Sequence, residues 1–147
     1  MTKITIEKMK DEDIDEALLA EQSHNIHILS KNILKTDIKN QNYYYLVAKD
    51  EDKKIIGYIG LSYILENADI ISIVVHKDYT NQGIACLLLQ EIFKFAKENN
   101  VQKIMLEVRK TNIPAQKLYE KHGFKQISIR EKYYEGIEDA LIYEKEL

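Results

Sequence analysis

Residues 74–89 combine an apolar run, a short polar turn that ends at Gly83, and a run of bulky aliphatic residues. This pattern is typical of a strand that passes through a tight turn into the N-terminus of a helix. A helix N-terminus leaves about four backbone N–H groups without intrahelical partners. These donors and the helix dipole together attract phosphate oxygens. Gly83 and the small Ala85 would let a pyrophosphate approach the backbone closely. The stretch therefore indicates a phosphate-bearing cofactor held mainly by backbone groups.

The same stretch also fits a strand–turn–helix connection that binds nothing, because glycines before helices are common. The sequence contains neither the phosphate-loop motif of ATP- and GTP-binding proteins nor the glycine-rich fingerprint of dinucleotide-binding domains. ATP, GTP and NAD are therefore disfavoured, and the identity of the cofactor depends on the rest of the chain.

The composition favours a soluble, cytoplasmic, globular protein. The 147 residues are 45% hydrophobic and 31% charged, which predicts a single domain over residues 1–147. No apolar run reaches the roughly 20 residues that span a bilayer, and the first residues lack the apolar core of a signal peptide. Cys86 is the single cysteine, so an internal disulfide is excluded. The net charge of −3 disfavours nucleic acid as a partner, and we expect no membrane partner; oligomeric state has no signal in the sequence.

Hydrophobic periodicity predicts an α+β fold with one mixed sheet flanked by helices, in the order β-α-α-β-β-β-α-β-α-β-β. Strands are expected at residues 4–8, 43–49, 55–65, 68–75, 103–108, 124–130 and 139–146. Helices are expected after the caps Asp11 and Asp13, from near Ser30, over residues 83–99, and between the cap Asn112 and Gly123. Their expected core faces are Ile14, Ala17, Leu18 and Leu19; Ile33, Leu34 and Ile38; Leu87, Leu88, Ile92, Phe95 and Ala96; and Ala115, Leu118 and Tyr119.

Three features follow one another along the chain at a definite spacing. They are the turn at residues 82–85, the strand residues 106–109, and a run over residues 112–124 that contains Asn112, Ala115, Leu118-Tyr119-Glu120 and Gly123-Phe124. In this spacing they resemble the GNAT superfamily of acetyl-CoA-dependent N-acetyltransferases. Residues 129–134 and 138–140 extend the resemblance to one branch, the ribosomal-protein-alanine N-acetyltransferases. The resemblance covers most of the chain and is strongest over residues 73–142.

The resemblance implies a GNAT fold that uses acetyl-CoA and no metal. The implied acceptor is a protein or peptide N-terminus, in this branch that of a ribosomal protein. The implied cofactor-binding residues are Ile73, Val74 and Val75 along the pantetheine arm, Asn81, Gln82, Gly83, Ile84, Ala85 and Cys86 at the pyrophosphate, and Asn112. The implied general base is Glu107 and the implied general acid is Tyr119, while Tyr133 and Tyr134 would border the substrate cleft.

The chain departs from the family pattern in two places. Thr80, Asn81 and Cys86 occupy turn positions where the family often has Gln or Arg, which removes side-chain contacts to phosphate but leaves the backbone donors. Residues 22–39 lack the Pro-Trp-Ser-like motif of the branch, and the chain has no tryptophan. We therefore expect the reaction type to follow the family more closely than the acceptor does.

The chemistry of the reaction independently suits Glu107 and Tyr119. Amide formation from a thioester requires a neutral amine as nucleophile and a proton for the departing thiolate. An α-amino group with a pKa of about 8 is roughly one-tenth neutral at pH 7, whereas lysine is neutral to less than about one part in a thousand. A carboxylate is a modest base and suits the α-amine better, while a tyrosine remains protonated at pH 7 and can donate.

Each candidate site residue can also be explained by a purely structural role. Glu107 would face the same way as Arg109 in a strand and could form a structural ion pair with it. Tyr119 could be a packed core residue, and Tyr133 and Tyr134 ordinary sheet residues. His24 and His27 could share a helical face, but no third metal ligand is apparent.

Two alternative functions remain open at this point. One is acetylation of a small-molecule amine or polyamine on the same fold. The other is a non-catalytic acyl-CoA-binding regulatory module, which the presence of both Glu107 and Tyr119 disfavours.

Overall fold

The computed structural model describes residues 3–26, 28–134 and 136–147, and these form one seven-stranded sheet in the order β1-β2-β3-β4-β5-β7-β6. The strands are β1 (Thr5–Lys8), β2 (Tyr43–Lys49), β3 (Ile55–Ile64), β4 (Asn67–Val75), β5 (Lys103–Arg109), β6 (Lys125–Tyr134) and β7 (Glu138–Glu146). The α-helices are α1 (Ile14–Gln22), α2 (Lys31–Asp37), α3 (Ile84–Glu98) and α4 (Ile113–Lys121), with short 3-10 helices η1 (Asp11–Asp13) and η2 (Lys77–Tyr79). The predicted order of strands and α-helices and the single mixed sheet are confirmed.

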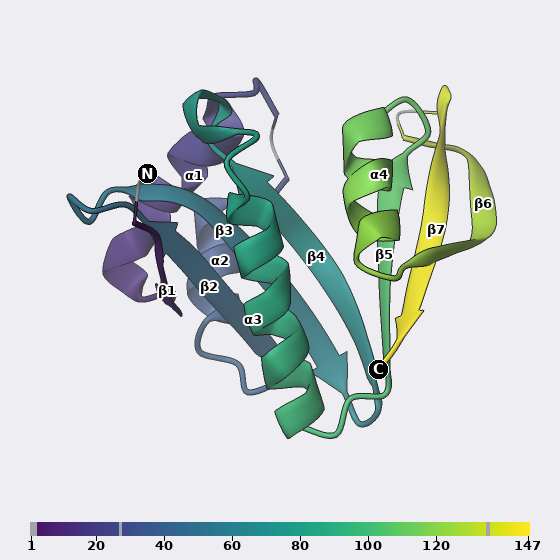
Figure 1. Cartoon of the computed structure of the whole chain (residues 1–147), viewed down its shortest axis with the longest axis horizontal. Coiled ribbons are helices and arrows are strands. Elements are labelled where there is room, and N and C mark those ends of the chain that lie inside the picture. Colours follow the sequence, from purple (N-terminus) through teal and green to yellow (C-terminus); the bar gives the residue numbers. More distant parts are fainter. Residues whose placement is uncertain (1–2, 27, 135) are drawn as a thin grey trace.

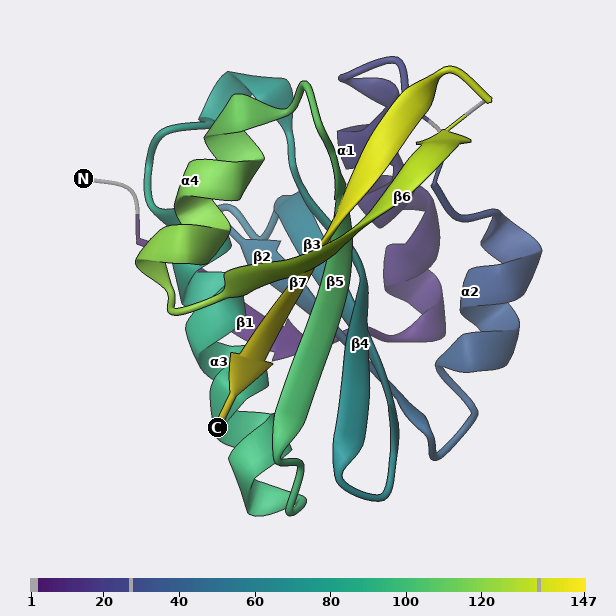
Figure 2. The same cartoon turned by 90° about the vertical axis from the view of Figure 1, so that its right-hand side faces the viewer.

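Helices cover both faces of the sheet, α3 and α4 on one side and α1 and α2 on the other (Figures 1 and 2). Along β2, Leu46 and Ala48 belong to the apolar cluster that contains α3, whereas Tyr45 and Val47 belong to the cluster that contains α1. Successive side chains of a strand point to opposite faces, so a continuous apolar run supplies both cores.

Strands β4 and β5 form a fork. They pair in parallel only where residues 67–69 meet residues 103–105, and beyond that they separate (Figure 1). The rest of β5 pairs with β7, and the rest of β4 pairs with β3 alone. One edge of β4 therefore carries backbone groups with no strand beside them over its second half, in the middle of the sheet.

The helix ends follow local signals in the sequence. The Ser30 side chain accepts the backbone N–H of Ile33 at the start of α2, and Asn112 Oδ1 accepts the backbone N–H of Ala115 at 3.2 Å at the start of α4. Gly123 follows α4 with a φ of +91°, a left-handed conformation that glycine adopts most easily. The expected helix start near Ser30 and the expected caps at Asn112 and Gly123 are confirmed.

Other local expectations were wrong. Asp13 does not cap α1 with its side chain; its carboxylate instead accepts the backbone N–H of Lys10, because the chain forms the extra turn η1 before the helix. Leu19, Ile33 and Leu87 are exposed, and Leu89 is buried instead of Leu87. Each consecutive residue turns about 100° around a helix, so a run of three leucines does not by itself indicate which of them faces the core. Strand β6 also continues to Tyr134, past the expected end at residue 130.

Candidate functional site

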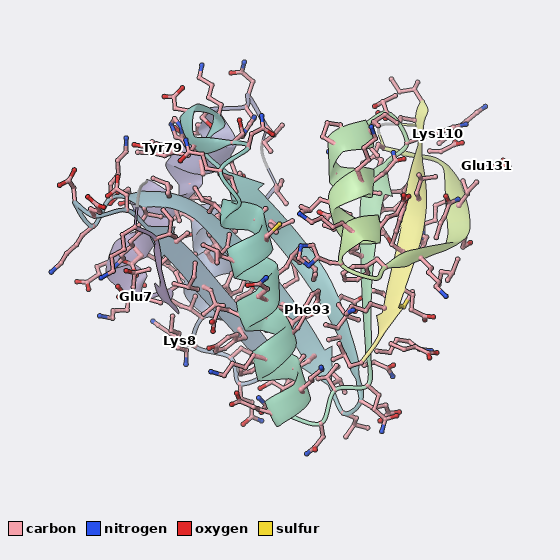
Figure 3. The ribbon with its side chains drawn as sticks, in the orientation of Figure 1. Glu7, Lys8, Tyr79, Phe93, Lys110 and Glu131 are labelled. Atoms are coloured by element: carbon pink, nitrogen blue, oxygen red, sulfur yellow. The ribbon has the colours of Figure 1, made fainter. Side chains whose placement is uncertain are left out.

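The turn before α3 presents a row of unused backbone donors. The first helical hydrogen bond is donated by Leu87 to the carbonyl of Gly83, at 3.1 Å. Within the described residues, the N–H groups of residues 81–86 have no acceptor. Asn81 and Gly83 have φ values of +63° and +79°, and a Cβ added to Gly83 would meet no atom within 4 Å. The turn is therefore open, and its donors are arranged as an anion site requires; Tyr79, labelled in Figure 3, ends the short helix just before it.

The unpaired edge of β4 lies next to this turn. The N–H of His76 donates to the carbonyl of Ile56 in β3, and backbone groups along a strand alternate between its two edges. The backbone groups of Ile73 and Val75 consequently face the fork, whereas those of Val74 face β3. The Nε2 atom of His24 already donates to the carbonyl of Val75 at 2.7 Å, which leaves the other edge groups available.

Two cavities meet inside the fork. The first, of about 630 Å³, lies between β4 and β5 and is lined by Glu107, Tyr134 and parts of the loop that joins α1 to α2. The second, of about 470 Å³, lies toward the start of α3 and is lined by residues that include Val74, Val75, Thr80 and Ala85. Both are lined by Ile26, Ile73, Asn112 and Tyr119. The fork thus forms a passage that leads from the turn of free donors to the side chain of Glu107.

Glu107 projects from β5 into the first cavity. Its Oε1 atom lies 3.3 Å from Nη1 of Arg130 in β6. Arg109 forms an ion pair of 3.0 Å with Glu138. The carboxylate of Glu107 thus faces the cavity from beside Arg130.

Tyr119 lies where the two cavities meet. It is 7% exposed, and its ring packs edge-on against Phe124 at a centroid distance of 5.8 Å. Burial, followed by the nearby Tyr134, raises the pKa of Tyr119 above its usual value, so the hydroxyl stays protonated. No other described residue forms a hydrogen bond with that hydroxyl. Tyr119 is thus a packed residue, as one alternative held, and its side chain also lines both cavities.

The two aromatic residues at the end of β6 differ in position. The pairing of β6 with β7 is irregular between Arg130 and Tyr134, and Tyr134 lines the first cavity. Burial, followed by the charge of Glu107, raises the pKa of Tyr134. Tyr133 is exposed and packs edge-on against Tyr134 with ring centroids 5.2 Å apart, but it lines neither cavity. The structure therefore brings Tyr134 to the passage and leaves Tyr133 outside it.

The remaining expected residues lie as follows. Asn112 lines both cavities, although its Oδ1 atom is occupied by the helix cap. Cys86 lies in the first turn of α3 and is partly buried. His24 binds a backbone carbonyl, and His27 lies outside the described residues. No group of three metal-binding side chains occurs in the part of the chain that the structure describes.

Sequence reasoning missed the cavity wall formed between α1 and α2 by residues 23–26 and 28–30, which we call the α1–α2 loop. Asn25, Ile26 and Ile28 line the first cavity, as does Ser72 of β4. The only signal was that residues 22–39 depart from the family pattern, which marked the segment without indicating which side chains face the site.

None of the helices in the described part of the chain is long and apolar enough to cross a membrane.

Comparison with known proteins identifies this architecture. The sequence model described as the Acetyltransferase (GNAT) family matches residues 6–124. The ribosomal protein bS18-alanine N-acetyltransferase of Escherichia coli strain K12 is 32% identical over 142 residues, which cover 94% of each protein. The crystal structure of the ribosomal-protein-S18-alanine N-acetyltransferase from Escherichia coli superposes with a TM-score of 0.89 at 28% identity, covering 98% of this chain and 94% of that one.

A second solved structure adds a ligand-bound example. The GNAT family acetyltransferase from Elizabethkingia anophelis, crystallised with acetyl-CoA bound, has a TM-score of 0.77 at 26% identity, with 98% of each chain covered. The family match over most of the sequence and the relative at 32% identity agree with the fork and the open turn, and they show that this chain belongs to the acetyltransferase (GNAT) family.

Proposed function

We propose that this chain, acting as one domain, transfers an acetyl group from acetyl-CoA directly to the N-terminal α-amine of a protein. The observation that carries the proposal is the passage through the fork, with free backbone donors at one end, Glu107 at the other and Tyr119 between them. The relative from Escherichia coli, named for the alanine of ribosomal protein bS18, favours a ribosomal protein as the acceptor. Such a reaction would take place in the cytoplasm, where ribosomes act.

The second cavity suits the cofactor. The N–H groups of residues 81–86 would bind the pyrophosphate oxygens. Because these donors belong to the backbone, they remain available although Thr80, Asn81 and Cys86 replace the Gln or Arg side chains that the family often has in this turn. The backbone groups of Ile73 and the N–H of Val75 would pair with the amides of the pantetheine arm, as a neighbouring strand would. The side-chain amide of Asn112 is a further contact within reach of both cavities.

The chemistry would then occur where the cavities meet. Glu107 accepts a proton from the ammonium group of the acceptor, directly or through one water, and the neutral amine attacks the thioester carbonyl. A backbone N–H on the open edge of β4 stabilises the oxyanion of the tetrahedral intermediate. When the carbon–sulfur bond breaks, Tyr119 donates its proton to the thiolate. The nitrogen of the new amide loses its extra proton, which restores the hydroxyl of Tyr119 directly or through solvent. Cys86, the single thiol of the chain, lies at the phosphate end in this arrangement, so transfer needs no acetylated enzyme.

The first cavity suits the acceptor. Tyr134 and the α1–α2 loop form its walls. The exposed Tyr133, which packs on Tyr134 outside the cavity, would meet residues further along the acceptor. A single carboxylate base also favours an α-amine over lysine, because the neutral fraction of the α-amine is roughly a few hundredfold larger at pH 7.

A pair of matched peptides tests the proposal. One has a free N-terminal alanine, and the other has a blocked N-terminus and one lysine. With acetyl-CoA and the purified chain, mass spectrometry should locate the acetyl group on the free α-amine, and the blocked peptide should react poorly. Acetylation confined to lysine, or to spermidine with both peptides untouched, would contradict the acceptor and favour the small-molecule alternative. Binding of acetyl-CoA without any transfer would favour the non-catalytic alternative.

A further inference from the structure

A buried carboxylate joins the α1–α2 loop to the sheet. Glu21, in the last turn of α1, is 1% exposed. Its Oε1 atom accepts the backbone N–H of Ile28 at 2.8 Å, and its Oε2 atom accepts the hydroxyl of Tyr58 in β3. An ionised carboxylate can only accept hydrogen bonds, and both neighbours donate, so the group is satisfied although it is buried. Glu21 therefore links one end of the loop to the middle of the sheet.

The connection continues back to the first cavity. The hydroxyl of Ser72 in β4 donates to the hydroxyl of Tyr58 at 3.0 Å. Burial, followed by the bond to Glu21, raises the pKa of Tyr58, which keeps this hydroxyl protonated. Ser72 and Ile28 both line the first cavity, whereas Tyr58 and Glu21 are buried behind them. A chain of hydrogen bonds thus begins and ends at the cavity wall and passes through the core.

The other end of the α1–α2 loop is attached separately. His24 donates to the carbonyl of Val75, and the hydroxyl of Ser23 accepts the backbone N–H of Lys77 at 3.1 Å. These two contacts hold the loop next to the second cavity. The side chain of Glu21 binds the backbone N–H of Ile28, at the end of the loop nearer α2. Ile28 lines the first cavity and not the second.

We propose that Glu21 is a positioning residue for the acceptor, holding Asn25, Ile26 and Ile28 in place as a preformed wall of the first cavity. The inference rests on the proposed function, because it assigns that cavity to the acceptor. A wall that is ordered before binding lowers the entropy lost when the acceptor binds, so its effect should appear in the affinity for the acceptor. A mutation that removes binding common to the ground and transition states raises KM and leaves kcat unchanged.

The exchange Tyr58→Phe tests this with the loss of one oxygen atom, and Tyr45→Phe is a matched control. Tyr45 is also buried, on the neighbouring strand β2, and its hydroxyl donates to the carboxylate of Asp37 at 2.8 Å. Neither Tyr45 nor Asp37 lines the two cavities. Both variants lose a tyrosine–carboxylate hydrogen bond, and Tyr58→Phe should lower Tm more, because Glu21 is 1% exposed whereas Asp37 is only half-buried and can bind water instead.

The two variants should differ at the site. Tyr58→Phe should raise KM for the alanine peptide by roughly tenfold, the weight of one hydrogen bond to a charged group, while kcat and the Kd of acetyl-CoA change by less than about threefold. Tyr45→Phe should leave all three values near those of the unmodified chain. Amide hydrogen exchange at Ile28, followed by NMR without any acceptor, should accelerate in Tyr58→Phe and remain unchanged in Tyr45→Phe.

Glu21→Gln should keep the loop in place and leave KM near that of the unmodified chain. Its side-chain oxygen can still accept the N–H of Ile28, and its amide can donate to the hydroxyl of Tyr58, which rotates to donate to Ser72. Equal KM values in the two tyrosine variants, or exchange at Ile28 unaffected by Tyr58→Phe, would overturn the role of Glu21. An unmodified chain that acetylates no peptide would contradict the proposed function instead, and the exchange rates would still decide whether Glu21 holds the loop.

Discussion

The carboxylate of Glu107 lies 3.3 Å from the guanidinium of Arg130, which reaches it from β6 across the intervening strand β7. Arg130 also lies 5.0 Å above the ring of Tyr133. The side chains of Glu107 and Arg130 are 31% and 56% exposed, so water screens their attraction and the pair can open. An ammonium group entering the first cavity would meet a carboxylate that is already oriented and whose partner can move away.

Exchange of Glu107 for Gln should reduce turnover by roughly 10²–10⁴-fold, since it removes a general base and changes the volume little. The loss should shrink as the assay pH rises, because more of the amine then arrives neutral. Glu144→Gln is a suitable control, since Glu144 pairs with Lys103 at 3.3 Å and lines neither cavity. A small loss that does not depend on pH would show that Glu107 serves only as the partner of Arg130.

Exchange of Arg130 for Gln should change kcat/KM for the alanine peptide by no more than about fivefold, because an exposed ion pair contributes about 0.2–1 kcal/mol. Arg130→Lys keeps the charge and should leave kcat/KM near that of the unmodified chain. High salt should reduce the difference between Arg130→Gln and the unmodified chain, because salt screens exposed charges. A change in Arg130→Gln that does not depend on salt would mean that this arginine acts through packing and not through its charge.

Exchange of Tyr119 for Phe should lower kcat by roughly 10²-fold or more with little change in the Kd of acetyl-CoA, because the ring still packs and only the proton donor is lost. Tyr143→Phe is the control. Tyr143 packs against Tyr119 with ring centroids 6.4 Å apart, but its own hydroxyl donates to Glu120. Stopped-flow detection of thiol release would identify the affected step. Unimpaired turnover in Tyr119→Phe would remove Tyr119 from the mechanism.

Exchange of Gly83 for Val should weaken coenzyme A binding well beyond its effect on stability. The side chain would occupy the open space in front of the free N–H groups. Backbone strain also contributes, since Gly83 has a φ of +79°. Gly136→Val is the matched control, because Gly136 has a φ of +73° and equally open surroundings in the hairpin between β6 and β7 and lines neither cavity. Both variants should lose stability from this strain, about 1–2 kcal/mol. Calorimetry that finds equal affinity for coenzyme A in the two variants would contradict the phosphate assignment.

The sequence predicted the elements and the turn because both depend on local patterns. Periodicity indicated the strands, and Ser30, Asn112 and Gly123 act within one turn of the helix ends that they cap. The pairing of Glu107 with Arg130 could not be predicted, because it depends on the register of β6 against β7 and on the irregular pairing after Arg130. The role of Glu21 was also hidden, since its partner Tyr58 is 37 positions away and Ser72, which donates to Tyr58, lies a further 14 positions along the chain.

Acidification should destabilise the fold through His122, which ends α4. Burial, followed by the charges of Lys121 and Lys145, lowers the pKa of His122 below its usual value near 6.5. In the described part of the chain its Nε2 atom is buried without a partner. The folded state therefore favours the neutral ring, and this contribution is present above about pH 6.5 and is lost as the pH falls through the lowered value.

The variant His122→Phe isolates this contribution, because a phenyl ring keeps the contact with Phe93 and cannot take up a proton. Phe93, labelled in Figure 3, lies on α3. Its ring centroid is 6.1 Å from that of His122. Urea unfolding at pH 7.5, 6 and 5 should find that the unmodified chain loses more free energy of unfolding on acidification than the variant does. The carboxylates that titrate in this range are shared by both chains, so their effect cancels in the difference. A difference that stays constant with pH would show that the ring of His122 takes up its proton equally well in the folded and unfolded states.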